Sequence, residues 1–307
     1  MLKKHHLYLL APLIITVYLS SCAGTAPNIY IPSTPPAIPK LKRPVQVALV
    51  LGSGGARGYA HLGVLQVLES AGVPIDLIVG ASAGSIVGSL YADNQSAAKT
   101  YDIMMQAGFW SFADIGNLPS PKGLSEGYHL QKFLLKNMRA KVFRELPTKF
   151  IVATTNLLTG QSHPLESGPI APAVLASAAV PGVVRPVNLY GLTLVDGGVA
   201  DPVPVDLAKK YSPKIIIAVN IEQKLSHSMP FSAFAIYNRA YSIMWNRLTQ
   251  YSLNNADIVI RPLVGDIGTF DLNHNYQMYQ EGYEAAKRAL PKIKKLLRRR
   301  HIAMTPR

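Results

Sequence analysis

The chain has 307 residues, 49% of them hydrophobic, and a formal net charge of +14. This length suffices for one large α/β domain or two small ones, and the hydrophobic content excludes an intrinsically disordered protein. A single cysteine excludes an internal disulfide framework. Because no His, Asp and Glu cluster has the spacing of metal ligands, we expect neither a metal nor a cofactor.

The N-terminal part of the chain is predicted to lie outside the folded domain. Residues 1–21 combine a basic start with a short apolar run over residues 7–19, which is typical of a secretory signal peptide. Small residues precede Cys22 and resemble the lipobox of bacterial lipoproteins, so we favour acylation of this cysteine over an incidental one. We therefore expect a lipid anchor in a bacterial cell envelope, at the outer membrane facing the periplasm. The proline-rich residues 22–44 are predicted to form a stiff tether.

The folded domain is predicted to span residues 45–286. The apolar run over residues 45–51 predicts a buried parallel strand, and residues 61–69 predict a helix. A second strand over residues 75–79 is followed by another helix. Further strands are expected at residues 150–155, 192–195, 214–221 and 256–260. Strands that alternate with helices predict an α/β fold with a parallel or mixed sheet covered on both faces.

The second predicted strand runs into a G-x-S-x-G motif from Gly80 to Gly84. Strand, tight turn and helix is the context of a nucleophile elbow, with Ser82 as the exposed nucleophile. The two glycines allow a strained turn and a close approach of neighbouring strands. The free N–H groups of the following helix favour a developing oxyanion nearby. The motif alone fits equally well with an ordinary helix start, so the rest of the chain has to decide.

A glycine-rich loop, G-S-G-G-A-R-G from Gly52 to Gly58, follows the first strand. It lacks the third glycine of a dinucleotide fingerprint and the G-K-[ST] of a P-loop. The interpretation that fits the next strand is an oxyanion loop, in which the N–H groups of Ser53, Gly54 and Gly55 face a substrate carbonyl. The alternative is a tight turn without function.

These two motifs and three later blocks resemble the patatin-like phospholipase family, particularly its bacterial branch related to neuropathy-target esterase. The later blocks are A-A-V-P-G at residues 178–182, D-G-G at 196–198 and P-V-P-V at 202–205. The resemblance covers residues 45–265, with the blocks in the family's order. It implies a three-layer α/β/α sandwich with a mostly parallel central sheet. It also implies a Ser–Asp dyad, with Ser82 as nucleophile and Asp196 as general base.

The residues around Asp196 support this assignment independently. Asp196 follows a predicted strand, and Gly197 and Gly198 behind it permit close backbone approach. The alternative is an aspartate that merely opens a turn. Asp201 is a competing carboxylate, but it precedes Pro202 and a predicted helix, so a turn or capping role suits it better.

Other polar residues near the motifs have structural interpretations. We expect Arg57 to anchor the glycine loop through backbone carbonyls, with attraction of a phosphate head group as the alternative. His61 is expected to make a structural hydrogen bond. A Ser-His-Asp triad esterase stays open as an alternative, because His227 or His274 could be recruited.

Three further regions each allow two interpretations. Aromatic residues within residues 96–146 predict either core cover or a mobile lid. Residues 229–251 predict a helix with an apolar stripe, for which core packing is favoured over a lipid-facing patch. Residues 287–307 form a basic, amphipathic C-terminal tail without acidic residues. We expect this tail to adsorb on an anionic membrane surface or to stay solvated, and not to bind nucleic acid.

Together these features predict a serine acyl hydrolase of the phospholipase A or lysophospholipase type. Its substrate would be a membrane phospholipid or lysophospholipid. A non-catalytic, membrane-tethered lipid-binding protein is the alternative from another functional class. The sequence leaves the oligomeric state open.

Overall fold

The computed structural model describes residues 26–41, 43–112, 114, 123–223, 225 and 229–305, without the side chains of Phe109 and Phe234. The signal peptide and Cys22 lie outside the described residues. So do residues 115–122, which fall within the expected lid, and His227 of the alternative triad. Predictions that concern these residues stay predictions.

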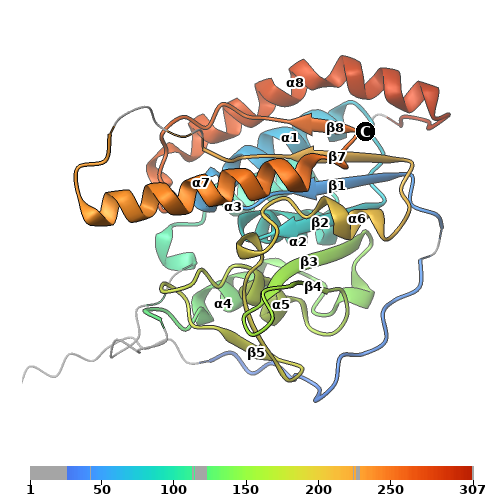
Figure 1. Ribbon diagram of the computed structural model, residues 1–307. Helices are drawn as coiled ribbons and strands as arrows, with labels where there is room; N and C mark the ends of the chain where they lie inside the picture. Colours follow the sequence, from blue (N-terminus) through green and yellow to red (C-terminus); the bar gives the residue numbers. More distant parts are fainter. Residues whose placement is uncertain are drawn as a thin grey trace, which may run out of the picture.

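An eight-stranded sheet forms the centre of the molecule, in the order β5-β6-β3-β2-β1-β7-β8, with β4 paired to β3 (Figure 1). The strands are β1 Val47–Leu51, β2 Leu77–Ala81, β3 Lys149–Asn156, β4 Ser162–Leu165, β5 Val187–Leu189, β6 Leu192–Asp196, β7 Ile215–Val219 and β8 Ile258–Ile260. The five strands from β3 to β8 in this order are parallel, whereas β4, β5 and β6 pair antiparallel. The sheet is therefore mostly parallel, as the sequence predicts.

The central strands are apolar on both faces because helices cover both sides. Leu49 of β1 packs into one hydrophobic cluster, and its neighbour Val50 packs into the cluster on the other face. Complete burial of both faces explains why these strands are continuous apolar runs without a polar alternation.

Helices form the two outer layers, which confirms the three-layer α/β/α arrangement (Figure 1). The larger cluster is covered by α1 Tyr59–Ser70, α2 Ala83–Asn94, α3 Ala97–Met105, α4 Tyr128–Asn137, α5 Ile170–Ser177 and α8 Asn275–Arg299. The smaller cluster is covered by α6 Val205–Lys209 and the end of α7 Ala233–Leu253. Short 3-10 turns occur at Gly55–Gly58, Phe109–Ser111, Phe143–Glu145, Gly197–Val199 and Leu272–His274.

The C-terminal segment differs from the expected free tail. Helix α8 continues without interruption from residue 275 to residue 299 and lies across α1. Ile293 and Leu297 are buried at 1% and 0% exposure, and Ile302 beyond the helix is also buried. Residues 287–305 thus belong to the folded domain, and most of the apolar stripe expected to adsorb on a membrane is already covered by protein.

The strand order reverses next to β1, between β1 and β7. The chain runs from β1 to β2 and β3 on one side, and later returns to β7 on the other side of β1. In open parallel sheets, ligands bind where the strand order reverses in this way. The glycine-rich loop leaves β1 at this point, and Ser82 leaves the adjacent parallel strand β2 at the same edge of the sheet.

Two absences concern the described part of the chain. None of its helices has the length and apolar character needed to cross a membrane. Within the same residues, no three His, Cys, Asp or Glu side chains are grouped so that they could hold a metal ion.

Candidate active site

Ser82 occupies a sharp turn between β2 and α2. Its backbone has φ 50° and ψ −121°, an unusual conformation for a residue with a side chain. Such a conformation costs on the order of 1–3 kcal/mol and persists only where the surrounding structure enforces it. A Cβ on Gly84 would lie 2.1 Å from the carbonyl oxygen of Leu51, so only glycine lets α2 begin this close to β1. The turn therefore has the geometry expected of a nucleophile elbow.

The structure brings Ser82 and Asp196 together across 114 positions of chain. The Ser82 hydroxyl donates a hydrogen bond of 2.6 Å to Oδ2 of Asp196. Asp196 ends β6, and its second carboxylate oxygen accepts the N–H of Gly198 at 2.8 Å. Its own N–H donates to the carbonyl of Ala179 at 2.9 Å, which connects the D-G-G block to the A-A-V-P-G block.

The environment of Asp196 makes its carboxylate more basic than usual. The residue is 3% exposed. This burial raises the pKa of Asp196 to about 6, while the hydrogen bonds from Ser82 and Gly198 act in the opposite direction. Asp201 is not among the causes of this shift. At neutral pH the group is therefore ionised and able to accept a proton.

The glycine-rich loop differs from its prediction at one of the three expected oxyanion donors. The N–H of Ser53 donates to the carbonyl of Pro202 at 2.8 Å, so it is already used within the protein. This removes Ser53 from the predicted donor set. Among the described residues, no acceptor pairs with the N–H of Gly54 or Gly55, which leaves those two amides as candidates.

Arg57 and His61 have the structural roles that the sequence indicates. The guanidinium of Arg57 donates to the carbonyls of Ile221 at 3.1 Å and Ile267 at 2.9 Å, and burial lowers its pKa. Nε2 of His61 donates to the carbonyl of Gly52 at 2.9 Å. His61 is fully buried, which lowers its pKa to about 4, so this ring is neutral at physiological pH. Both side chains fix the loop to neighbouring segments.

The motif glycines share one property: the backbone or a neighbouring side chain approaches them too closely for a Cβ. At Gly198, an added Cβ would lie 2.3 Å from the Trp245 ring and 2.5 Å from Oγ of Ser53. Contacts of 2.9 Å or less would also arise at Gly52, Gly58, Gly80 and Gly197. The D-G-G loop, the glycine-rich loop and α7 thus meet around Gly198.

Two residues that support the dyad are not apparent from the motif residues alone. Oγ of Ser177 accepts the N–H of Ser82 at 2.9 Å and donates to the carbonyl of Ala153 at 2.6 Å. Oγ1 of Thr155 donates to the carbonyl of Asp196 at 2.8 Å. Ser177 directly precedes the A-A-V-P-G block, which is the signal that could have identified it.

The residues considered as alternatives to the Ser82–Asp196 dyad make other contacts. Asp201 accepts a hydrogen bond of 2.7 Å from Ser252 of α7, and burial raises its pKa to about 6. Its N–H bonds to the carbonyl of Gly197, which agrees with a role in the turn. His274 pairs with Asp271 through Nδ1 at 3.0 Å. No histidine in the described residues hydrogen-bonds to Ser82 or Asp196.

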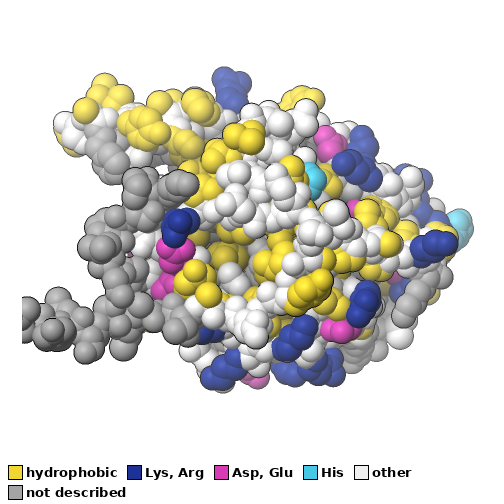
Figure 2. Space-filling view, turned by 90° about the horizontal axis from the view of Figure 1, so that it is seen from below, with side chains coloured by type: hydrophobic (Ala, Val, Ile, Leu, Met, Phe, Trp, Pro, Cys, Tyr) yellow, Lys and Arg dark blue, Asp and Glu magenta, His cyan; other side chains and the backbone are white. Residues whose placement is uncertain are grey.

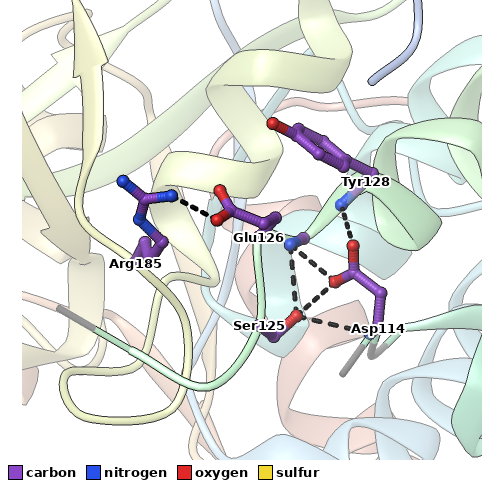
Figure 3. A network of polar contacts seen from close by, with 6 residues as sticks. Asp114, Ser125, Glu126, Tyr128 and Arg185 are labelled. Carbon is purple, nitrogen blue, oxygen red and sulfur yellow. Dashed lines mark hydrogen bonds and ion pairs between the residues drawn. The ribbon is translucent and has the colours of Figure 1, made fainter. Parts of the chain in front are cut away.

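The described ends of the expected lid are fixed to the domain (Figure 3). The Asp114 carboxylate accepts the N–H groups of Gly127 at 2.7 Å and Tyr128 at 3.1 Å, together with the Ser125 hydroxyl. This arrangement caps the start of α4 with negative charge. Arg185 pairs with Glu126 and joins the same segment to the loop before β5. The lid itself stays a prediction, because residues 115–122 are not described.

The comparisons agree with the geometry. The sequence model for patatin-like phospholipase matches residues 49–209. The chain therefore belongs to the patatin-like phospholipase family.

Similar proteins include enzymes named as lysophospholipases. Lysophospholipase nte1 of Aspergillus fumigatus is 27% identical over 284 residues, covering 81% of this chain and 18% of the fungal protein. An uncharacterized NTE family protein of Mycobacterium tuberculosis is 36% identical over 180 residues, covering 57% of this chain and 49% of that protein. The chain thus spans less than a fifth of the fungal relatives and about half of the mycobacterial one.

A solved structure supports the fold. VipD from Legionella pneumophila superposes with a TM-score of 0.56 at 14% sequence identity, covering 81% of this chain and 67% of that chain. At this identity the likeness concerns the fold alone.

Proposed function

We propose that this protein is a serine acyl hydrolase that cleaves lipid esters, with Ser82 as nucleophile and Asp196 as general base. The observation that carries the proposal is the 2.6 Å hydrogen bond from Ser82 Oγ to Asp196 Oδ2 at a strained strand-to-helix turn. Membership of the patatin-like phospholipase family supports an ester of a lipid as the substrate.

In the proposed acylation step, Asp196 accepts the hydroxyl proton while Ser82 Oγ attacks the ester carbonyl. The carbonyl π bond breaks, and its oxygen becomes a tetrahedral oxyanion. When this intermediate collapses, the bond to the leaving alcohol breaks, and the proton passes from Asp196 to that alcohol. Water activated by Asp196 then attacks the acyl-enzyme and releases the carboxylic acid, which regenerates the Ser82 hydroxyl.

Two groups of donors are available for the oxyanion. The N–H groups of Gly54 and Gly55 have no acceptor among the described residues. The N-terminus of α2 begins directly after Ser82 and contributes a partial positive charge. Removal of one such donor in other serine hydrolases lowers kcat by roughly 10²–10³-fold, so two well-placed amides would account for much of the rate enhancement.

We take the substrate to be a phospholipid or lysophospholipid of a membrane. The names of the fungal relatives support this class. The anchor at Cys22 in a bacterial envelope would bring the domain to such a surface, and that anchor rests on the sequence alone.

An activity-based fluorophosphonate probe tests the assignment of the nucleophile. We expect wild-type protein to be labelled, Ser82→Ala to lose labelling, and Asp196→Asn to react at least about 100-fold more slowly. Ser89→Ala is a matched control, because its hydroxyl bonds to the Ile86 carbonyl within α2, away from the dyad. Absence of labelling in folded wild type would contradict the proposal and favour a lipid-binding protein.

A screen with defined lipids tests the substrate class. Purified protein is incubated with phosphatidylcholine and lysophosphatidylcholine, and fatty acid release is measured. We expect release from at least one of the two, and none with Ser82→Ala. Hydrolysis of small soluble esters without any release from either lipid would contradict the proposed substrate.

A further inference from the structure

Helix α7 is anchored to the domain by its C-terminal half. Thr249, Ser252 and Leu253 are buried, and Ser252 bonds to Asp201. Towards its start at Ala233 the helix extends beyond the rest of the domain (Figure 1). Ser232 caps this start, since its hydroxyl accepts the N–H of Ala235 at 3.1 Å, so the projecting part is a properly terminated helix.

The projecting part of α7 carries a stripe of exposed apolar and aromatic side chains. Its members share one side of the helix, because their spacing follows the 3.6-residue period. They are Ile236, Tyr237, Ala240, Tyr241, Ile243 and Met244, and Tyr251 continues the same side along the anchored end; all of these side chains are exposed. Met229 and Phe231 just before the helix are 75% and 97% exposed. Figure 2 shows hydrophobic side chains gathered on the part that projects from the body.

The charge of this segment favours a lipid surface. Residues 229–253 contain no acidic residue, and their two charged side chains are Arg239 and Arg247. Tyrosine, tryptophan, isoleucine and methionine beside arginine is the composition of helices that lie in a membrane interface. The exposed Arg247 lies on the side of the stripe by the same spacing, whereas a helix side that faces only water would carry several charges.

The stripe is continuous with the proposed active site. Trp245 follows Met244 of the stripe and contacts the D-G-G loop, where a Cβ on Gly198 would lie 2.3 Å from its ring. Tyr241 and Trp245 pack with ring centroids 5.7 Å apart. Tyr241 is 44% exposed, and burial of the rest of its side chain raises its pKa to about 12, with a smaller contribution from the negative charge of Asp196. The same helix therefore contacts the D-G-G loop, which begins with Asp196, and carries the exposed stripe.

We propose that the stripe on α7, together with Met229 and Phe231, is the surface by which this protein docks on a lipid bilayer. The inference rests on the proposed function, since a bilayer is where a lipid ester would be found. The apolar side chains enter the interfacial zone, while Arg239 and Arg247 remain near the head groups. Docking through this surface brings the bilayer to the side of the domain where α7 contacts the D-G-G loop.

The test measures flotation with vesicles of phosphatidylcholine and a minor share of phosphatidylglycerol. Every protein is full length with Cys22→Ser and Ser82→Ala, so that neither an acyl anchor nor turnover affects binding. Ile236→Glu/Met244→Glu changes the stripe. Asn238→Glu/Ser242→Glu is the matched control, because it adds the same charge to the opposite side of the same helix.

We expect the stripe pair to lower vesicle affinity at least about 10-fold relative to the control pair. Equal loss in both pairs would overturn the proposal, because charge alone would then explain binding. Unchanged binding in the stripe pair would also overturn it. If the stripe pair instead converts a dimer into a monomer in light scattering, the occupant is a second copy of the chain, and the bilayer proposal is wrong.

Probe labelling separates this inference from the proposed function. With Ser82 restored, the stripe pair should react with the fluorophosphonate within about twofold of wild type, because neither residue belongs to the dyad or the glycine loop. Labelling that fails in wild type contradicts the hydrolase. Flotation that is insensitive to the stripe contradicts only the docking surface.

Discussion

Helices α7 and α8 are the two longest helices of the described chain, and they use their apolar stripes in opposite ways. The apolar side of α8 packs on α1, with Ile293 and Leu297 buried. The apolar side of α7 is exposed along its projecting part, with Met244 at 66% exposure. The sequence instead favours core packing for α7, and for α8 it predicts either membrane adsorption or a solvated tail.

The difference shows what an amphipathic pattern determines. A 3.6-residue stripe predicts that one side of a helix meets an apolar environment, but it does not specify whether that environment is protein or lipid. For α8 the apolar environment is protein, because the helix packs on α1. Gly63 of α1 and Gly282 of α8 let the two backbones approach, since a Cβ on Gly282 would lie 1.8 Å from the Ala60 carbonyl oxygen. Among the described residues, the projecting part of α7 makes no crossing comparable to that of α8 with α1.

The largest expected effect is at this crossing. Gly282→Ala should lower the free energy of unfolding by about 4 kcal/mol or more, because backbone must move to admit the methyl group. The gain in helix propensity, about 1 kcal/mol, is too small to compensate. Urea unfolding followed by circular dichroism measures the change. Gly108→Ala is the control, since no atom lies within 4 Å of its Cβ position, and a loss as large there would contradict this account.

A matched truncation compares the two stripes directly. Leu297→Ala on α8 should cost about 3 kcal/mol, because a fully buried leucine leaves a cavity. Ile236→Ala on α7 should change the stability by less than about 0.5 kcal/mol, because this side chain is 53% exposed. Chemical denaturation in detergent-free buffer gives both values. Equal costs would mean that the α7 stripe is covered by protein in solution.

The strands and the elbow were predictable from the sequence because their causes are local. Continuous apolar runs mark the buried parallel strands, and Gly80 to Gly84 mark a turn that few other sequences allow. The pairing of Ser82 with Asp196 followed from the family resemblance, and the structure has the expected hydrogen bond. Strand β5 and helix α5 were not predicted, because neither has a distinctive period or boundary signal.

Which N–H groups of the glycine-rich loop are available to an oxyanion could not be predicted from the sequence. Whether the N–H of Ser53 is free depends on where the Pro202 carbonyl lies, 149 positions later in the chain. The same holds for Ser177, which reaches Ser82 only through the packing of α5 against β3 and α2. Partners this distant in sequence are decided by tertiary structure, which single motifs do not specify.

The two buried carboxylates near α7 should differ in their effect on the pH profile. Both have a pKa raised to about 6 by burial, but Asp196 bonds to Ser82 and Asp201 to Ser252 of α7. A general base must be ionised, so kcat/KM on a soluble ester should fall about 10-fold per pH unit below about pH 6 and level off above it.

Asp201→Asn provides the control for that profile. The asparagine keeps an acceptor for Ser252 and removes only the charge. The fall of kcat/KM at acid pH should therefore persist, with its midpoint within about half a pH unit of the wild-type value. If kcat/KM of Asp201→Asn no longer falls at acid pH, the ionisation of Asp201 controls the activity. That result would also assign α7 a part in the chemistry beyond contact with the D-G-G loop.

The smallest expected effect concerns the basic side of α8, which was predicted to bind an anionic surface. Lys295 and Arg299 are exposed, whereas the leucines between them are wholly or partly covered. Lys295→Glu/Arg299→Glu should therefore weaken vesicle binding through charge alone, by about fivefold per position at low salt. Because exposed charges are screened, this loss should vanish in about 0.5 M salt, while the loss from the α7 stripe pair persists. If the α8 pair still abolishes flotation at high salt, apolar contact with the bilayer belongs to α8, and the contrast between the two helices fails.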